Sequence, residues 1–549
     1  MPQQAYKTLS KGEIYALLHN RTKQWDFPTL STLPHPYQLK SCEQASHFLA
    51  QKMREKPKIL VVGDYDVDGV IASVVMMKFF ALLGYEHISY VIPSRFSDGY
   101  GVSKAIIEAN PSDIVITVDN GTTAYEAAAY CKQQGITLII TDHHIPKESL
   151  PEADFIINPQ QKDCTFPQKE ICGALVAWYF CAGLKIALGV NISLVPLLEL
   201  VMLATIADMM PLTQINKCIV LYGLKQLPTS QNPALQKLKT YLKTRYITAT
   251  DIAFSLTPLL NAAGRMGEGR IASEFLLLDS GNFSSALTQD DRAHRLKACS
   301  LASALDSGLQ ALIALNQARK DTAKSVLESA KACVIVYENA VIARGDDWHE
   351  GVLGIVAAQM ANFYKRPAFV LSHTKEPGLE SMLKGSARSF GEVDLMSMLL
   401  GANEILGEFG GHSKAAGLSV EIASFDELCA YLDSLSVLPK CQTTQEELGA
   451  LLIDVSDINE ELFALLQEFE PYGQGNPKPI LQARLQIRQI QSIKQHRKFS
   501  FFGTDIGGIY FFCEQKFEAR DWILASFTMQ MDSYSGKPIM VLQEAERIG

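Results

Sequence analysis

The sequence lacks the marks of a secreted protein, a membrane-spanning protein or a strongly basic one. Its 11 cysteines are scattered and include no Cys-x-x-Cys pair, which argues against a cysteine-based zinc site and favours a reduced setting. No run approaches the roughly 20 apolar residues of a membrane span, and no apolar secretory core follows Met1. The net charge of −9 argues against coating nucleic acid by bulk charge, although local basic grooves matter more than the total. We expect a cytoplasmic protein without a membrane partner.

The chain has an ordinary globular balance, with 549 residues of which 47% are hydrophobic and 20% charged. A chain of this length exceeds a single hydrophobic core. We predict an α/β fold class, in which a parallel-sheet domain and a smaller α/β domain are joined by a long helix and followed by an OB-like β-barrel. The predicted segments are an N-terminal segment (1–50), a first α/β domain (51–215), a helical region with the long connecting helix (216–330), a second α/β domain (331–435) and the barrel (436–549).

The first domain is organised around the apolar run Ile59–Val62, which is followed by Asp64-Tyr65-Asp66-Val67-Asp68-Gly69. The run predicts a buried parallel strand, and ligands collect at the carboxyl ends of such strands. Three carboxylates at alternate positions repel one another unless a cation lies between them, and a hard divalent metal is the simplest one. An EF-hand loop would need a Glu where Val75 stands. A surface turn that uses Asp for local hydrogen bonds is the remaining alternative.

The same pattern of an apolar strand followed by metal-binding residue types recurs along this domain. Later strand-like runs end in Asp119-Asn120-Gly121-Thr122 and in Thr141-Asp142-His143-His144. Strands that alternate with helical stretches predict a mostly parallel sheet, whose strand ends meet at one edge. The residues expected to line one pocket there are Asp66, Asp68, Asp119 and His143, with His144 as a further candidate.

One more acid, Asp208, ends the apolar and mainly helical stretch 173–208. It could cap a helix, but a buried, unpaired carboxylate costs several kcal/mol, so a buried Asp208 would need a partner such as a metal. About four aspartates and a histidine suit two divalent ions about 3.5–4 Å apart. Imidazole among carboxylates favours Mn²⁺, with Mg²⁺ as a competitor. The predicted chemistry is hydrolysis of a phosphoester or phosphoanhydride.

The second half of the chain carries glycine-rich segments with basic side chains. We predict loops at 261–267, 385–389 and 410–417, where small residues permit close backbone approach to phosphates and Arg, His or Lys clamps them. The stretch 290–330 contains a single glycine, Gly308, and no proline, which predicts a long helix between domains.

The last hundred residues contain short β-like runs and a local excess of positive charge. Between Pro479 and Arg520, seven Lys and Arg residues stand against three acids. Basic residues interleaved with aromatic ones suit a small barrel that stacks the bases of a single strand, and the alternative is that the aromatic rings fill the barrel core. The rings concerned are those of Phe499, Phe501, Phe502, Tyr510 and Phe511, and the predicted strands are 480–487, 499–502, 508–512 and 539–542.

Together these motifs resemble the DHH phosphoesterase superfamily, and within it the single-stranded-DNA-specific exonucleases. The matching motifs are Asp64–Gly69, Asp119-Asn120-Gly121, Asp142-His143-His144, Asp208 in Ile206-Ala207-Asp208, and Gly411–Gly417 of the companion DHHA1-type domain. Trp348–Gly351, Asn261–Arg265 and Tyr472–Pro477 also resemble segments of those exonucleases. The resemblance covers residues 50–549.

The resemblance implies a metal-dependent exodeoxyribonuclease that removes mononucleotides from the 5′ end of single-stranded DNA in recombination and repair. It implies metal ligation by Asp66, Asp68, Asp119, His143 and Asp208, with Asp64 and His144 as ligands or as residues that support ligands. Asp142 is expected to support His143 from behind. The residues expected to hold DNA phosphates are Arg265, Arg388, His412 and Ser413.

The expected partners are single-stranded DNA, a helicase and a single-strand-binding protein, and the chain is expected to act as a monomer. One alternative is a relative that cleaves short oligonucleotides, cyclic dinucleotides or polyphosphate, although such relatives are shorter and lack the barrel. A second alternative is a non-catalytic scaffold, although such relatives lose the acidic motifs that are intact here.

Overall fold

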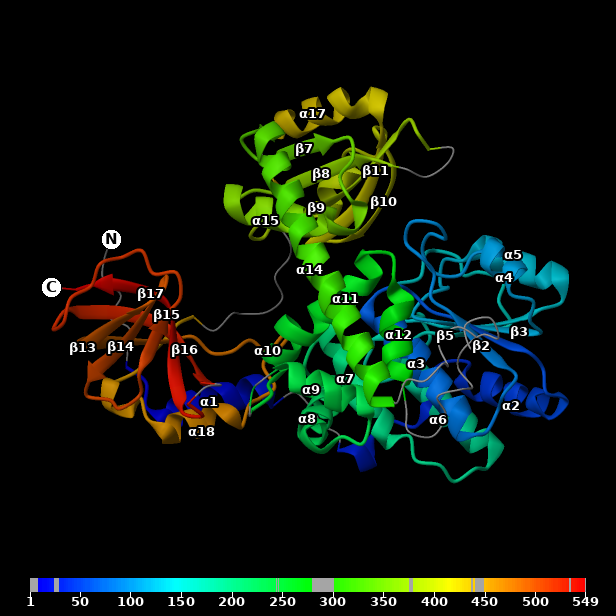
Figure 1. Ribbon diagram of the computed structural model, residues 1–549, viewed down its shortest axis with the longest axis horizontal. Coiled ribbons are helices and arrows are strands. Elements are labelled where there is room, and N and C mark those ends of the chain that lie inside the picture. Colours follow the sequence, from blue (N-terminus) through cyan, green and yellow to red (C-terminus); the bar gives the residue numbers. More distant parts are fainter. Residues whose placement is uncertain are drawn as a thin grey trace.

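Three β-sheets, joined by helices, organise the residues that the structure describes (Figure 1). The computed structural model describes residues 8–23, 29–242, 244, 246–278, 301–374, 379–435, 438–439, 449–532 and 535–548. The predicted fold class is confirmed, with a parallel sheet, a second α/β sheet and a C-terminal barrel. Within these ranges no helix is both long enough and apolar enough to cross a membrane.

The first sheet is parallel, with strand order β2-β1-β3-β4-β5, and is buried on both faces. Side chains alternate between the faces, so that Ile59 and Val61 join one core while Leu60 and Val62 join another. The strands are β1 (Ile59–Val62), β2 (Ile88–Val91), β3 (Ile114–Val118), β4 (Thr137–Thr141) and β5 (Phe155–Ile157). Helices α2 (Cys42–Lys52), α3 (Val67–Leu82) and α6 (Gly173–Leu188) pack in the first core, and α4 (Lys104–Ala109) and α5 (Tyr125–Gln134) in the second.

A set of helices lies between the first sheet and the other two domains (Figure 1). Its long helix α14 (Leu301–Cys333) runs up into the second domain, and residues 290–300 of the predicted connecting helix lie outside the described residues. The other helices are α7 (Leu198–Ala207), α8 (Gln214–Gln226), α9 (Pro233–Leu242), α10 (Ala249–Asp251), a π-helical turn (Ile252–Leu256), α11 (Thr257–Arg265) and α12 (Gly269–Leu277).

The loop predicted at 261–267 is wrong for its first five residues, which form the end of α11. Their small side chains serve helix packing instead. A Cβ added at Gly264 would lie 1.9 Å from the backbone oxygen of Tyr65, so only glycine lets α11 lie directly on the segment between β1 and α3.

The second domain has a mixed sheet with strand order β10-β11-β9-β8-β7-β6. The loops predicted at 385–389 and 410–417 are mostly wrong, because these residues fall largely in β9, β10 and β11, where Gly417 pairs with both Gly410 and Ser386. At Gly410 and Gly417 the paired strands therefore present only backbone atoms. The strands are β6 (Ile335–Val336), β7 (Val341–Gly345), β8 (Ala368–His373), β9 (Met382–Arg388), β10 (Leu406–His412) and β11 (Ala415–Glu421), with helices α15 (Glu350–Tyr364), α16 (Leu395–Leu400) and α17 (Phe425–Ser434).

The C-terminal sheet closes into a barrel because β13 pairs with both β14 and β16. The four predicted runs correspond to β13, β14, β15 and β17, whereas β16 was not predicted. The strands are β12 (Leu451–Leu452), β13 (Leu481–Ile493), β14 (His496–Phe502), β15 (Gly508–Tyr510), β16 (Trp522–Met531) and β17 (Pro538–Arg547), and α18 (Glu460–Gln467) precedes β13.

The helix α1 (Lys11–Thr22) packs on this barrel rather than on the first domain (Figure 1). Ile14 and Leu18 are fully buried in the barrel core, and Leu9 donates its backbone N–H to Leu452 O at 2.8 Å. The predicted N-terminal segment 1–50 is therefore divided between two cores, since α2 packs with the first sheet. The domain boundaries themselves stay predictions.

We predict that Leu18→Ala destabilises the barrel by about 2–5 kcal/mol, because it leaves a cavity in a fully buried contact. Chemical denaturation followed by the near-ultraviolet signal of the barrel aromatics measures the change. Asn20→Ala, on the exposed face of the same helix, is the control and should leave the transition in place. Equal stability of the two variants would show that α1 does not contribute to the barrel fold.

Candidate metal centre and substrate cleft

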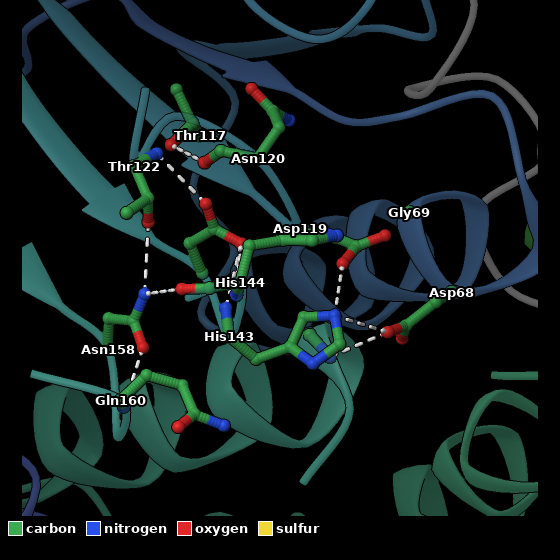
Figure 2. Close-up of polar contacts among 12 residues, drawn as sticks. Asp68, Gly69, Thr117, Asp119, Asn120, Thr122, His143, His144, Asn158 and Gln160 are labelled. Atoms are coloured by element: carbon green, nitrogen blue, oxygen red, sulfur yellow. Dashed lines mark hydrogen bonds and ion pairs between the residues drawn. The ribbon is translucent and has the colours of Figure 1, made fainter. Parts of the chain in front are cut away.

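Four of the predicted ligands meet at the carboxyl edge of the first sheet. Figure 2 shows the ring of His143 between Asp68 and Asp119. The Nε2 atom of His143 lies 3.1 Å from Asp119 Oδ1, 3.6 Å from Asp208 Oδ2 and 3.7 Å from Asp68 Oδ2. The structure thus brings together residues that span the chain from β1 to the end of α7.

Asp64 and Asp66 form a second group with Asp119, in which one oxygen of each carboxylate lies within 4.8 Å of the others. Asp66 caps α3, since its Oδ1 accepts the backbone N–H of Asp68 at 2.9 Å and of Gly69 at 3.1 Å. This cap makes α3 begin at Val67. Asp119 also forms a possible ligand set with His143 and His144, and the remaining set is Asp68, His143 and Asp208.

Backbone geometry holds Asp68 and Asp119 in place. The carboxylate of Asp68 accepts the first two N–H groups of α6, from Gly173 at 2.6 Å and Ala174 at 2.8 Å. A Cβ at Gly173 would lie 2.5 Å from Asp119 Oδ1, so glycine is required where α6 approaches the cluster. Asp119 itself has φ of 63°, the left-handed region that Asp and Asn tolerate better than most residues.

The carboxylates of this cluster repel one another when all of them are ionised. Burial, with the neighbouring Asp66, raises the pKa of Asp68 to about 7, and burial, with Asp68 and Asp66, raises the pKa of Asp208 to about 9. Burial and neighbouring carboxylates also hold the pKa of Asp64 and Asp119 well above the usual range. The buried oxygens Asp64 Oδ1, Asp119 Oδ1 and Asp208 Oδ2 have no hydrogen-bond partner. A bound cation would supply the missing partner and relieve the repulsion.

His143 is neutral beside the acids. Burial lowers its pKa to about 4, although a backbone hydrogen bond at Ile171 acts in the opposite direction. Nε2 is the ring nitrogen that faces the carboxylate oxygens, and a neutral imidazole has one unprotonated nitrogen that can bind a metal. This donor set fits divalent metal ions, because carboxylate oxygens and a neutral imidazole are the ligands that Mn²⁺ takes.

Asp142 was predicted to support His143, and it does so only through the backbone N–H of that residue, because its side-chain partner is the ring of His144. Its Oδ1 lies 2.7 Å from Nδ1 of His144 and accepts the backbone N–H of His143, while Oδ2 accepts the N–H of Thr122. Burial opposes protonation of His144, but the bond to Asp142 outweighs it and raises the pKa of His144 to about 9. His144 is half-exposed, and its Nε2 lies 3.4 Å from the hydroxyl of Tyr100. Asp142 therefore orients His144 toward the cleft.

A cleft of about 620 Å³ separates this edge from the second domain. Of the predicted phosphate-binding residues, Arg265 and Arg388 line it. His412 and Ser413 lie just beyond the lining, at the turn between β10 and β11. The first-domain wall also contains Tyr65, Arg95 and Tyr100, and the second-domain wall contains Lys384, Ser386 and the bare glycines of β10 and β11.

Guanidinium groups gather in this cleft. Burial, with the cations of Arg95, Arg319 and Arg388, lowers the pKa of Arg265 to about 10. The hydrogen-bond acceptors of Arg265 and Arg388 are neutral groups, Gly351 O and Ser386 Oγ among them. Such a cluster of cations is a binding site for phosphates.

Sequence reasoning missed Arg95 and Arg319 in this cluster. Arg95 lies in the loop after β2, at the same sheet edge as the aspartates, and its guanidinium stands 4.4 Å from the centre of the Tyr65 ring. Its position directly after a strand was the available signal. Arg319 lies in the middle of α14, where no motif marks it.

The barrel aromatics divide between core and surface. Phe499 and Phe501 are buried in the barrel core, so the prediction that they stack bases is wrong for these two rings. Phe502 and Phe511 are exposed, as is Phe512 at 69%. Phe512 packs against His496 at 4.8 Å between ring centres, and Arg488 lies 5.2 Å from the Phe502 ring. We call Arg488, His496, Phe502, Phe511 and Phe512 the barrel patch.

Comparison with known proteins assigns the three domains. The description "DHH family, N-terminal domain" matches residues 58–205, the DHHA1 domain matches residues 335–436, and the RecJ OB domain matches residues 451–543. The single-stranded-DNA-specific exonuclease RecJ of Salmonella typhimurium is 31% identical over 500 residues, which cover 86% of this chain and 82% of that protein. The chain belongs to the RecJ family. The resemblance to the DHH superfamily is thereby confirmed.

Other RecJ proteins agree in sequence and in fold. RecJ of Haemophilus influenzae is 31% identical over 520 residues, covering 88% of this chain and 84% of that protein. The crystal structure of Thermus thermophilus RecJ in complex with Mn²⁺ matches with a TM-score of 0.78 at 23% identity, over 97% of this chain and 76% of that one. This chain therefore shares the three-domain fold of Thermus thermophilus RecJ.

Proposed function

We propose that this chain is a metal-dependent exonuclease that hydrolyses single-stranded DNA from its 5′ end, releases mononucleotides and serves recombination and repair. The observation that carries the proposal is the arginine-lined cleft that opens beside the cluster of acids and His143. The relatives named RecJ are single-stranded-DNA-specific exonucleases. The alternative of a phosphodiesterase for short oligonucleotides or cyclic dinucleotides is not favoured, because the chain carries the RecJ OB domain.

We propose that Asp64, Asp66, Asp68, Asp119, His143 and Asp208 hold two Mn²⁺ or Mg²⁺ ions. When bound, the ions lower the pKa of a water and stabilise charge on the attacked phosphate. Asp119 would contribute to metal binding from two of the possible ligand sets, one with Asp64 and Asp66 and one with His143 and His144.

The remaining residues of the cleft contact the phosphates of the single-stranded DNA. Arg95, Arg265 and Arg388 neutralise phosphates and hold the strand end against the acids. His144, fixed by Asp142, donates a hydrogen bond from Nε2 to an oxygen of the reacting phosphate. His412 and Ser413 extend the phosphate contacts at the rim of the cleft. A cytoplasmic location, a monomeric state and work beside a helicase and a single-strand-binding protein complete the proposal.

Degradation of end-labelled strands tests this function. With Mn²⁺, a 5′-labelled single strand should release its label as mononucleotide from the first time points, while a 3′ label stays on shortening strands. Release of the 3′ label first would refute the polarity, and equal rates on duplex and single strands would refute the strand specificity.

We predict that Arg388→Ala lowers kcat/KM on single strands about 10- to 100-fold, mostly through KM. The change removes a charge-assisted phosphate contact worth about 1.5–3 kcal/mol. Steady-state kinetics on a labelled oligonucleotide measures it. Arg366→Ala is the control in the same domain, because its guanidinium bonds Tyr337 O outside the cleft. Similar kinetics for the two variants would exclude Arg388 from phosphate binding.

The barrel patch is proposed to stack bases of the incoming strand. We predict that Phe512→Ala weakens binding to a long single strand by about 1–3 kcal/mol, the usual worth of one stacked base, without changing kcat on a short one. Fluorescence anisotropy measures the binding. Phe254→Ala removes another strongly exposed ring, this one from the helical region. An equal effect there would point to nonspecific adhesion rather than stacking on the barrel.

A further inference from the structure

The loop between α18 and β13 contacts the segment that carries Asp208. Leu212, four residues after Asp208, donates its backbone N–H to Gln474 O at 2.7 Å. Gln474 lies in a tight turn, in which Gly473 and Asn476 exchange backbone hydrogen bonds of 2.9 and 3.1 Å. We call residues 473–476 the barrel turn. It joins the barrel to the chain just beyond a carboxylate of the metal centre.

Two glycines allow this close contact. A Cβ at Gly473 would lie 2.7 Å from Leu212 Cδ1, and one at Gly475, where φ is 70°, would lie 3.0 Å from Pro211 Cβ. Larger residues would push the barrel turn away from Pro211 and Leu212. The glycines of this motif therefore serve a contact between domains.

Asn476 holds the barrel turn in its conformation. It is 0% exposed, and its Nδ2 donates to Phe469 O at 2.8 Å and to Pro471 O at 2.9 Å. Its Oδ1 accepts a hydrogen bond from Arg21 of α1 at 2.9 Å. A buried amide with these bonds fixes its surroundings, and removing it leaves buried acceptors unpaired.

The opposite side of the same segment is tied to the neighbourhood of His143. Asn216 donates from Nδ2 to Pro211 O at 3.0 Å and to Glu170 O at 2.7 Å. Glu170 immediately precedes Ile171, whose backbone hydrogen-bonds His143. Pro211 and Leu212 are thus held between the barrel turn and the backbone that positions His143.

We propose that the barrel turn positions Asp208 for metal binding, with Asn476 as the positioning residue. The barrel then contributes to metal affinity in addition to its contact with the strand. This inference rests on the proposed metal-dependent function. Groups hydrogen-bonded directly to metal ligands typically contribute about 10- to 100-fold to metal affinity. Asn476 acts on Asp208 through the barrel turn and Leu212, so loss of its amide should raise the Mn²⁺ dissociation constant at the lower end of that range, by about tenfold.

The test measures Mn²⁺ binding to the whole 549-residue chain. The electron paramagnetic resonance signal of free Mn²⁺ reports the unbound metal. The measurement is made at a temperature at which circular dichroism shows that each variant is folded. Asn476→Ala should bind Mn²⁺ about tenfold more weakly. Its exonuclease rate on a short strand should be low at limiting Mn²⁺ and should recover at saturating Mn²⁺. A merely structural defect would instead lower the maximal rate at every Mn²⁺ concentration.

Two further variants make the result decisive. Asn459→Ala breaks another amide between α1 and the barrel, where Lys11 donates to Asn459 Oδ1 at 3.2 Å, and should leave Mn²⁺ affinity unchanged. Gly473→Ala should weaken Mn²⁺ binding even if Asn476→Ala does not fold. Unchanged affinity in a folded variant of the barrel turn, or equal weakening in Asn459→Ala, overturns the proposal. Failure of the unaltered protein to bind Mn²⁺ would instead overturn the metal-dependent function.

Discussion

Asp119→Asn is expected to lower the exonuclease rate by about three orders of magnitude, while binding of a single strand stays close to normal. Asp119 occurs in two of the three possible ligand sets among the described residues. Metal ions supply several kcal/mol of charge stabilisation in such reactions, and each step of about 1.4 kcal/mol corresponds to a tenfold change in rate. Asn keeps the shape and tolerates the φ of 63° at this position. Single-turnover kinetics and strand binding measure the two effects separately.

The same variant should leave the metal-free protein at least as stable as before. The carboxylate of Asp119 is buried beside other acids and has an unpaired oxygen, so its neutral replacement removes repulsion. Asp163→Asn is the control, because Asp163 pairs with Lys40 on the surface. Retained turnover in Asp119→Asn, or a large loss in Asp163→Asn, would contradict the ligand role.

Gly264→Ala is expected to lower kcat on a short strand about a hundredfold. The added Cβ would lie 1.9 Å from Tyr65 O, so α11 and the Asp64–Asp68 segment must separate by about 1 Å. A displacement of that size at reacting groups costs about 100-fold, and overpacking costs about 1–3 kcal/mol of stability. Activity assays and thermal unfolding measure the two losses.

Gly308→Ala is the matched control for this prediction. Its Cβ would meet the side chain of Phe275 at 2.8 Å, so it also crowds a helix contact, less severely than Gly264→Ala and away from the aspartates. We expect a smaller loss of stability and near-normal kcat. If both variants lose activity in proportion to stability, the close approach at Gly264 has no specific effect on the metal centre.

The convergence of the acids was predictable because it follows from strand direction alone. Apolar runs such as Ile59–Val62 identify parallel strands, and parallel strands bring Asp66, Asp119 and His143 to one edge. The partner of Asp142 was not predictable in the same way. His143 and His144 are adjacent in sequence, and only the turn after β4 decides which ring Asp142 contacts.

Glycine-rich segments were misassigned because glycine has two uses. It permits turns, but it also permits close packing of regular elements, as at Gly264 in α11 and Gly417 in β11. The barrel aromatics, in contrast, carried a usable signal. Side chains alternate along a strand, so Phe499 and Phe501 share the core face of β14 and Phe502 points away from it. The contact between α1 and the barrel has no local signature at all.

The contact between α1 and the barrel sets a delay in the synthesis of the protein. Lys11 and Asn459 are 448 residues apart in the sequence, a length that ribosomes translate in roughly 20–90 s at about 5–20 residues per second. During that interval the apolar face of α1, with Ile14 and Leu18, cannot yet pack on its barrel. The nascent chain therefore exposes this face to chaperones and to neighbouring chains until translation of the barrel is nearly complete.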